Sequence, residues 1–287
     1  MITEKSYSLK TILEKNKIPA PAAHFVLGSG LAPAFDQLKE IPKSFEFLKE
    51  ISFNDVEGLV PSTAPGHRAR FRFYLNKETK KSIVFQVGRL HGYEGHSPKL
   101  VVQPMVQSAL AGCKHFVLNN AAGSLNPKFL PGSLMIIRDH VNMTGQNPFT
   151  GPNPIDPRTG VAPGPRFLDL SETYSEEFSN RLKKSLAEEF TVHEGTYLGL
   201  SGPTYETPAE VKLFASWGLG AVGMSTVWES MAIRHLGGTV AGFSLISNMG
   251  CGLVSKAALS HTEVEEEASK VAPKLLLKLF QFGESLK

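Results

Sequence analysis

The chain has 287 residues, 41% of them hydrophobic and 20% charged, and its formal net charge is +3. This composition is that of an ordinary globular protein and excludes disorder for the bulk of the chain. The charge is too small and too scattered for a nucleic-acid surface, but it suits an anionic small substrate. Only two cysteines are present, Cys113 and Cys251, which excludes a disulfide framework and favours a reducing compartment. No apolar stretch has the length of a signal peptide or a membrane span, so we expect a cytoplasmic protein.

The first part of the chain predicts one helix followed by strands. A helix is expected at about 8–17, and the apolar run 24–28, which glycine ends, is typical of a buried strand. Residues 70–75 and 82–87 are rich in aromatic and β-branched residues and are separated by the polar NKETKK, which is the pattern of a β-hairpin. Residues 98–112 then carry apolar residues at helical spacing.

The later part of the chain alternates apolar strands with helices. The expected strands are 115–123, 133–141, 196–202, 220–224 and 238–247, and the expected helices are 175–190, 207–217, 226–236 and 262–282. This alternation predicts an α/β sheet covered on both faces, and the hairpin makes the sheet mixed. The Pro- and Gly-rich stretch 146–165 is the only candidate linker. Because elements of one style flank it, we interpret it as a long loop within one domain that spans 1–287.

Two segments that follow predicted strands suggest an anion site. Residues 28–30 (GSG) could bring backbone N–H groups and a hydroxyl to a phosphate, although they match no nucleotide fingerprint and a plain strand-ending turn explains them equally well. Arg89 offers a planar fork for oxyanions. His91 follows two residues later, and a nearby carboxylate such as Glu94 could hold its imidazole. A metal site on His91 and His96 is the weaker interpretation, because their spacing fits no common motif.

Further polar or small residues stand at the ends of strands or at the start of a helix. Residues 119–124 (NNAAGS) leave room for a flat ligand, although a close-packed loop is equally consistent with them. Glu206 could be a first-turn acid that answers a helix dipole, or it could accept a ring N–H while Tyr205 packs on the ring. Asn248 supplies a donor and an acceptor, which discrimination of a heterocycle edge requires. Together with 223–226 (GMST), these shared positions favour a site over scattered core residues.

Taken in order, the segments resemble the trimeric, low-molecular-mass class of purine nucleoside phosphorylases over nearly the whole chain. The matching blocks are GSGL at 28–31, PGH at 65–67, GRLHGYEG at 88–95, NAAGSLNPKF at 120–129, IIRDHVN at 136–142, GQNPFTGPN at 145–153, GTYLGLSGPTYET at 195–207, AVGMSTVWE at 221–229 and FSLISN at 243–248. The resemblance implies a single α/β domain with a central mixed β-sheet flanked by helices. The chain departs from the commonest pattern of the family at Ser124, Tyr205, Trp228 and Ala32-Pro33.

The resemblance also implies a role for each matching residue. Around the phosphate it places Ser29, His67, Arg89, His91, the backbone of Ala121, and Ser225; around the ribose, Tyr93, Met224 and His261; around the base, Ala122, Gly123, Tyr205, Glu206 and Asn248. His91, Glu206 and Asn248 are the expected catalytic residues. Phe167 is expected to reach the ribose in the neighbouring subunit of a homotrimer, so that the active site would need an oligomer. Inorganic phosphate is the implied co-substrate, and neither a metal nor an organic cofactor is implied.

The implied reaction is direct attack of phosphate on C1′ of a purine nucleoside, with inversion, to give the free base and ribose 1-phosphate. Asn248 and Glu206 indicate 6-oxopurines, inosine and guanosine, rather than adenosine. A methylthioadenosine phosphorylase of the same fold is the main alternative, although Asn248 and the GPTYET block argue against it. A purine-binding protein without catalysis and a nucleoside hydrolase remain two further alternatives, and a requirement for phosphate in turnover would distinguish them.

Overall fold

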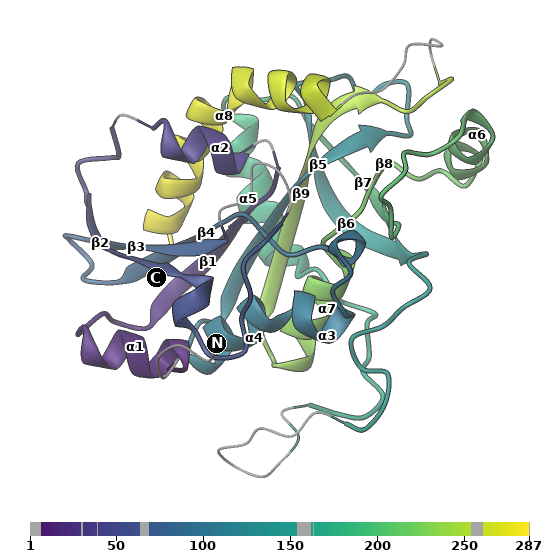
Figure 1. Cartoon of the computed structure of the whole chain (residues 1–287). Coiled ribbons are helices and arrows are strands. Elements are labelled where there is room, and N and C mark those ends of the chain that lie inside the picture. The colour runs from purple at the N-terminus through teal and green to yellow at the C-terminus, as the bar shows by residue number, and fades with distance from the viewer. Residues whose placement is uncertain are drawn as a thin grey trace.

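The strands in the described part of the chain join one nine-stranded mixed sheet, as the computed structural model shows (Figure 1). The structure describes residues 7–29, 31–38, 40–63, 69–153, 162, 164–253 and 261–286, with the backbone alone for 261–265. The strands are β1 (Pro21–Leu27), β2 (Phe45–Ser52), β3 (Arg70–Asn76), β4 (Ser82–Val87), β5 (His115–Ser124), β6 (Leu134–Asn142), β7 (Val192–Gly199), β8 (Ala221–Gly223) and β9 (Thr239–Met249). Their order in the sheet is β2-β3-β4-β1-β5-β8-β7-β6-β9, and β5 also pairs with β9.

The pairings of the second half of the sheet close into a ring. β5 pairs with β8, β8 with β7, β7 with β6, β6 with β9, and β9 again with β5. β5 therefore changes neighbours along its length: Leu118 is its last residue paired with β1, and Gly123 is its first paired with β8. Between these two points, at 119–122, the described pairings leave one edge of β5 without a strand neighbour. This gap in the sheet is where a ligand can approach the backbone of β5.

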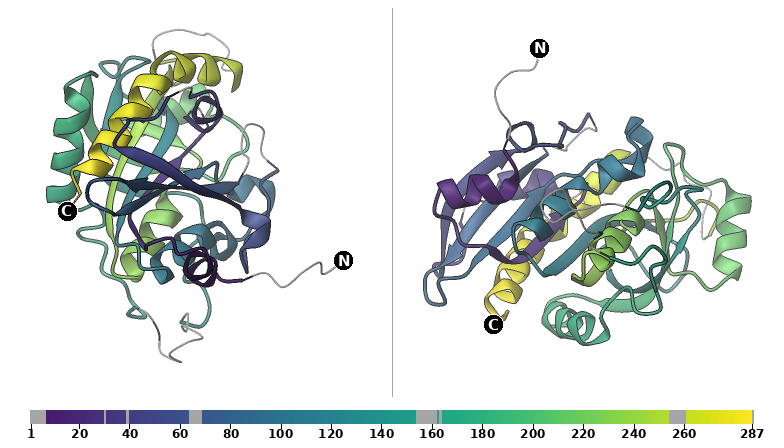
Figure 2. Two further views of the ribbon diagram at one scale, coloured as in Figure 1. Left: turned by 90° about the vertical axis from the view of Figure 1, so that its left-hand side faces the viewer. Right: turned by 90° about the horizontal axis from the view of Figure 1, so that it is seen from below.

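Helices cover both faces of the sheet. They are α1 (Leu9–Lys15), α2 (Leu31–Asp36), α3 (Pro98–Val101), α4 (Gln103–Leu110), α5 (Glu176–Ala187), α6 (Pro208–Ser216), α7 (Val227–His235) and α8 (His261–Glu284), with short 3-10 turns at Phe53–Asp55 and Gly92–Glu94. α2, α5 and α8 lie on one side, and α1, α3, α4 and α7 lie on the other (Figure 1). In Figure 2, α8 (yellow) crosses the sheet on the side away from α1 (purple). Among the described residues, no helix combines the length and the apolar character that crossing a bilayer requires.

Each layer of helices buries its own apolar cluster against the sheet. On the side of α7, Met105 of α4 and Met231 of α7 pack with Phe73 and Phe116 from the strands. On the other side, Phe280 of α8 is fully buried among aromatic residues of α2, β2, β3 and β4. Burial on both faces explains why strands such as β1 are apolar nearly throughout. α6 stands apart at the right of Figure 1 and covers a smaller apolar cluster.

The predicted α/β class, the hairpin of β3 and β4 and all the expected strands and helices are confirmed, although some bounds were wrong. The predicted helix 98–112 is two helices, because Pro104 has no N–H to donate and stands in the first turn of α4. The strand predicted at 196–202 is β7, which runs from Val192 to Gly199. β2 and the short α2 were not predicted. Of the stretch 146–165, the described residues form no helix or strand, in agreement with a loop.

Candidate active site

A cavity of about 390 Å³ lies beside the gap in the sheet. Its walls come from the ends of β5, β8 and β9, from the turns that follow β1 and β4, and from the segment before α6. The lining residues are Ser29, Arg89, His91, Tyr93, Asn120, Ala121, Ala122, Gly123, Pro203, Tyr205, Glu206, Val222, Gly223, Met224, Ser225, Ser247 and Asn248. The polar residues that stand at strand ends therefore line one cavity.

Arg89 forms one end of the cavity and is only 1% exposed. Its Nη1 donates to the carbonyl oxygen of Asn119 (2.7 Å) and to Oγ of Ser225 (3.2 Å). On the other side of the guanidinium, Nε donates to Oε1 of Glu229 (3.3 Å), and Nη2 lies 3.2 Å from Oε2 of the same carboxylate. Gly28 leaves room for the guanidinium, because a Cβ atom at this position would lie 3.1 Å from Nη1 of Arg89. The arginine is thus held from three directions at the edge of the cavity.

His91 lies beside Arg89 and is oriented by Glu94. The backbone N–H of His91 donates to Oε1 of Glu94 (2.8 Å), and Nδ1 of its ring lies 3.3 Å from the same oxygen. Burial lowers the pKa of His91; the hydrogen bond with Glu94 opposes this effect and the charge of Arg89 adds to it, so the site favours the neutral imidazole. Burial alone would raise the pKa of Glu94, but hydrogen bonds from His91 and Thr63 bring it well below its usual value. The ring of Tyr93 stacks on His91, with centroids 4.5 Å apart.

The N-terminus of α7 lies next to Arg89, because Ser225, just before this helix, accepts a hydrogen bond from it. Thr226, its N-cap, has φ of +75°, which a β-branched residue adopts only under constraint. Its backbone N–H donates to Oε2 of Glu229 (3.0 Å), and its Oγ1 accepts from Nδ2 of Asn120 (2.9 Å). These contacts hold the preceding residue, Ser225, which lines the cavity and whose backbone N–H lies 3.4 Å from the hydroxyl of Tyr197.

Asn248 lies beside Gly123, farther along β5 than the contact of Arg89 with Asn119, and Glu206 also lines the cavity. The register between β5 and β9 shifts at Gly123, which pairs with Asn248 while Ala122 pairs with Ile246. Consecutive strand residues normally face opposite sides, but this bulge lets Ser247 and Asn248 both line the cavity. Ser247 donates from Oγ to Oδ1 of Asn248 (2.8 Å). A Cβ atom on Gly123 would lie 3.3 Å from Nδ2 of Asn248, so this glycine leaves room for the amide.

Glu206 is outside the helix that follows it. The N-cap of α6 is Thr207, and the acid that completes its capping box is Glu210, whose carboxylate accepts from the N–H of Thr207 (2.7 Å). The interpretation of Glu206 as a first-turn acid is therefore wrong, and Glu206 is instead among the residues that line the cavity. Burial raises the pKa of Glu206, and the nearby Glu210 contributes in the same direction. Tyr205, beside it, also lines the cavity and keeps 40% of its surface exposed.

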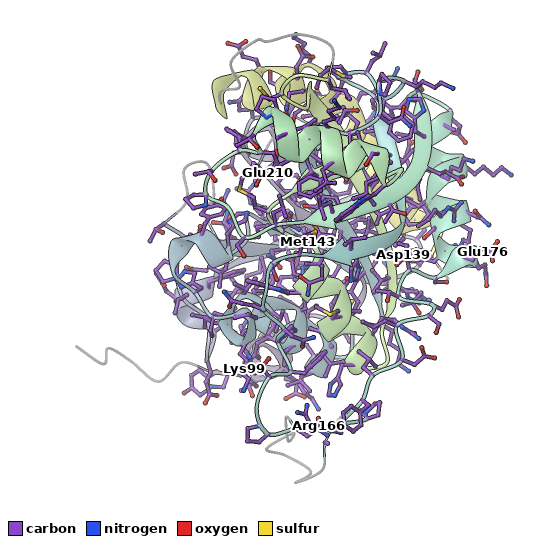
Figure 3. The ribbon with its side chains drawn as sticks, turned by 90° about the vertical axis from the view of Figure 1, so that its right-hand side faces the viewer. Lys99, Asp139, Met143, Arg166, Glu176 and Glu210 are labelled. Atoms are coloured by element: carbon purple, nitrogen blue, oxygen red, sulfur yellow. The ribbon has the colours of Figure 1, made fainter. Side chains whose placement is uncertain are left out.

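For three residues to which the resemblance assigns roles, the described structure does not test the assignment. His67 lies outside the described residues, and for His261, the first residue of α8, the structure describes the backbone alone. Phe167 is 90% exposed. Its neighbour Arg166 and Glu210 of α6 lie at opposite ends of one face of the molecule in Figure 3. Phe167 is thus available to another molecule, as the expectation for a neighbouring subunit requires.

The sequence prediction missed several residues of this region. Pro203 and Val222 line the cavity without a chemical signal of their own. Glu229 stands behind Arg89, 140 residues away in sequence, and only its place three residues after Thr226, typical of a capping box, could have drawn attention to it. Among the described residues, no group of three or more His, Cys, Asp and Glu is arranged to hold a metal ion. His91 and His96 instead both face the carboxylate of Glu94.

Comparison with known proteins agrees with this fold. Residues 26–281 match the family described as the phosphorylase superfamily, and the chain belongs to it. The purine nucleoside phosphorylase 1 of Geobacillus stearothermophilus is 40% identical over 260 residues, which are 90% of this chain and 89% of that protein. The chain is accordingly an enzyme of the purine nucleoside phosphorylase class, a pentosyltransferase that carries a sugar from a purine base to phosphate.

Solved structures of the same class superpose over nearly the whole chain. The purine nucleoside phosphorylase of Schistosoma mansoni in complex with adenosine has a TM-score of 0.80 and 29% identity, covering 97% of this chain and 96% of that chain. The same enzyme in complex with inosine has a TM-score of 0.81 and 28% identity, covering 97% of this chain and 95% of that chain. The single-domain α/β fold predicted from the resemblance is confirmed.

Proposed function

We propose that this enzyme phosphorolyses 6-oxopurine nucleosides, inosine and guanosine and their deoxy forms, in purine salvage. The observation that carries the proposal is that one cavity is lined by Arg89, His91 and Ser225 toward Asn119 and by the amide of Asn248 toward Gly123, with the acid Glu206 also among its lining residues. Such a cavity can hold a phosphate and a heterocycle at the same time. A nucleoside that spans the two ends would place C1′ of its sugar between them.

At the anion end, phosphate would be bound by Ser29, Arg89, His91, Ser225 and the backbone N–H of Ala121. Hydrogen bonds from charged donors and from oriented dipoles are strong where water is excluded. The neutral imidazole of His91 can donate one hydrogen bond to a phosphate oxygen without adding charge. As the glycosidic bond lengthens, the bound anion stabilises the positive charge that develops on the sugar, and this stabilisation grows toward the transition state. His67 keeps its implied role at the phosphate as part of the proposal.

At the other end, Asn248 would hydrogen-bond N7 and O6 of the purine, and the carboxylate of Glu206 would accept from N1–H. Negative charge moves into the purine as it leaves, so a donor at N7 and O6 is worth more in the transition state than in the bound nucleoside. Tyr205, Ala122 and Gly123 would contact the base, and Tyr93, Met224 and His261 would contact the ribose. We further propose that the enzyme is a cytoplasmic homotrimer in which Phe167 covers the ribose in the next subunit. The reaction needs phosphate as its co-substrate and no cofactor.

The base preference is tested by comparing kcat/KM for inosine, guanosine and adenosine at saturating phosphate. A polar site that faces the wrong exocyclic group can discriminate by factors of order 10⁴, so we expect adenosine to be poorer than inosine by about 100-fold or more. The Schistosoma mansoni enzyme was solved with adenosine as well as with inosine, so binding alone does not answer the question. Equal kcat/KM values for inosine and adenosine would contradict the proposed roles of Asn248 and Glu206.

The role of Phe167 is tested with Phe167→Ala and a measurement of molecular mass in solution. We expect the wild type to be a trimer, and we expect the variant to show an increased KM for inosine with an unchanged KM for phosphate. Full activity of a monomeric wild-type enzyme would contradict a shared site.

A further inference from the structure

Behind the anion end of the cavity, one buried carboxylate contacts two of its walls. Glu229 is 2% exposed and is not among the residues that line the cavity, whereas Arg89, in front of it, is. One oxygen of Glu229 accepts from Nε of Arg89, and the other lies 3.2 Å from Nη2 of Arg89 and accepts from the N–H of Thr226. A single side chain thus touches both the arginine and the turn that carries Ser225.

We infer that Glu229 is a positioning residue for phosphate: it sets the orientation of the Arg89 guanidinium and the backbone of Ser225-Thr226, so that both face one anion. This inference rests on the proposed function, because it needs phosphate to bind at Arg89. Glu229 would thus contribute to phosphate binding without itself touching the substrate. Glu229 contacts the Nε and Nη2 side of the guanidinium, whereas Asn119 and Ser225 accept from Nη1.

Geometry requires such a partner for two reasons. A guanidinium is planar, so two contacts with one carboxylate fix both its position and its tilt, and Nη1 is then directed at Asn119 and Ser225. The second reason is the strained φ of Thr226 (+75°), which persists only if neighbouring groups hold it. The carboxylate of Glu229 and the amide of Asn120 provide two of these contacts.

Charge leads to the same conclusion. An arginine that is 1% exposed would be expensive to bury alone, and a buried pair contributes little net stability compared with apolar residues of the same shape. Stability by itself is therefore a weak reason for a charged pair at this place. Orientation of a charged donor toward an anion is a function that an apolar pair could not provide.

The test is the kinetics of Glu229→Gln, which keeps the volume of the side chain but turns an amide N–H toward the donors of Arg89 or Thr226. Loss of one well-oriented charged contact weakens binding affinity by about 10- to 100-fold, so we expect the KM for phosphate to rise at least about tenfold. The KM for inosine at saturating phosphate should stay within about twofold. Glu229→Asp separates the two contacts: it retains an acid that can cap Thr226 but shortens the reach to Arg89. If positioning of Arg89 matters, Asp will not restore the KM for phosphate.

A matched control exists elsewhere in the chain. Arg138 also makes a two-point pair with a glutamate, since its Nε lies 3.2 Å and its Nη2 3.0 Å from the carboxylate oxygens of Glu194, but neither residue lines the cavity. Glu194→Gln also weakens a two-point pair, here a more exposed one, and should leave the KM for phosphate unchanged. A readout independent of turnover is the rise of the unfolding temperature with added phosphate, which follows from binding to the folded state. This rise should shrink in Glu229→Gln and persist in Glu194→Gln.

The outcomes separate this inference from the proposed function. If phosphate neither supports turnover of the wild type nor raises its unfolding temperature, the proposed function fails. If the wild type responds to phosphate and folded Glu229→Gln responds equally, the inference is wrong. It is also wrong if only kcat falls, or if the KM values for phosphate and inosine rise together, because a merely structural role would produce those results. Should Glu229→Gln not fold, Glu229→Asp decides: a KM for phosphate equal to that of the wild type contradicts the inference.

Discussion

Two glycines allow the ends of the cavity to be perturbed separately by the smallest possible side chain. A Cβ atom on Gly28 would lie 3.1 Å from Nη1 of Arg89 and from the carbonyl oxygen of Asn119, and 3.2 Å from Cα of Asn120. Two of these three atoms belong to the backbone of β5, so Arg89 is the group that can move. Gly28→Ala should therefore displace the guanidinium by a few tenths of an ångström and disturb its 2.7 Å hydrogen bond to Asn119.

Overpacking of this kind costs about 1–3 kcal/mol. If that cost falls on phosphate binding, the KM for phosphate rises about fivefold to 100-fold, because 1.4 kcal/mol is a factor of ten. Gly123→Ala provides the opposite perturbation, since its Cβ would lie 3.3 Å from Nδ2 of Asn248 and 3.5 Å from Cγ1 of Val222. It should raise the KM for inosine and leave that for phosphate nearly unchanged.

The assay is steady-state kinetics with each substrate varied at saturating levels of the other. Circular dichroism would show that both variants are folded. The assignment of the two ends would be refuted if the two alanines affected the two KM values equally, or if Gly28→Ala acted on inosine and Gly123→Ala on phosphate.

Three further predictions follow from the side chains of the site. Asn248→Asp should raise the ratio of kcat/KM for adenosine to that for inosine by about tenfold or more, because an acid suits a 6-amino group; an unchanged ratio would remove Asn248 from base recognition. The pKa of His91 in the fold lies below its ordinary 6.5, so its protonation favours the unfolded chain, and its contribution to stability is lost as pH falls below about 6.5. Thermal unfolding at pH 5–7 should show a shallower loss for His91→Asn, by up to about 1.4 kcal/mol per pH unit; parallel curves would contradict the assignment. Trp228→Phe loses the hydrogen bond from Nε1 to Oγ1 of Thr144 (3.0 Å) and should lower the free energy of unfolding by about 1 kcal/mol, whereas Trp217→Phe, at a side chain 50% exposed, should change it by less than about 0.5 kcal/mol.

Most residues of the candidate site could be located from the sequence because they stand at or near the ends of strands. Arg89, Ala121 and Asn248 lie far apart in the chain, but each lies near or just after the end of an apolar strand. β4 pairs with β1, β1 with β5 and β5 with β9, and all three pairs are parallel. The carboxyl ends of parallel neighbours meet at one edge of the sheet. Recognition of the strands therefore located most of the cavity.

Features without a local pattern could not be predicted in the same way. β2 lies at the edge of the sheet with much of its surface exposed, so it lacks the continuous apolar run that marks β1. The bulge that directs both Ser247 and Asn248 into the cavity depends on pairing with β5 and not on the local sequence. The contact between Glu229 and Arg89 likewise joins α7 to the turn after β4, and only the fold brings the two together.

The central claim is that this cavity transfers a pentosyl group to phosphate, and the most direct test is the conversion of inosine to hypoxanthine with and without phosphate. The account predicts turnover only when phosphate, or arsenate in its place, is present, with one ribose 1-phosphate formed for each hypoxanthine in the phosphate reaction. Release of hypoxanthine at the same rate without phosphate would show a hydrolase, and no release under either condition would show a binding protein. Either result would contradict the account.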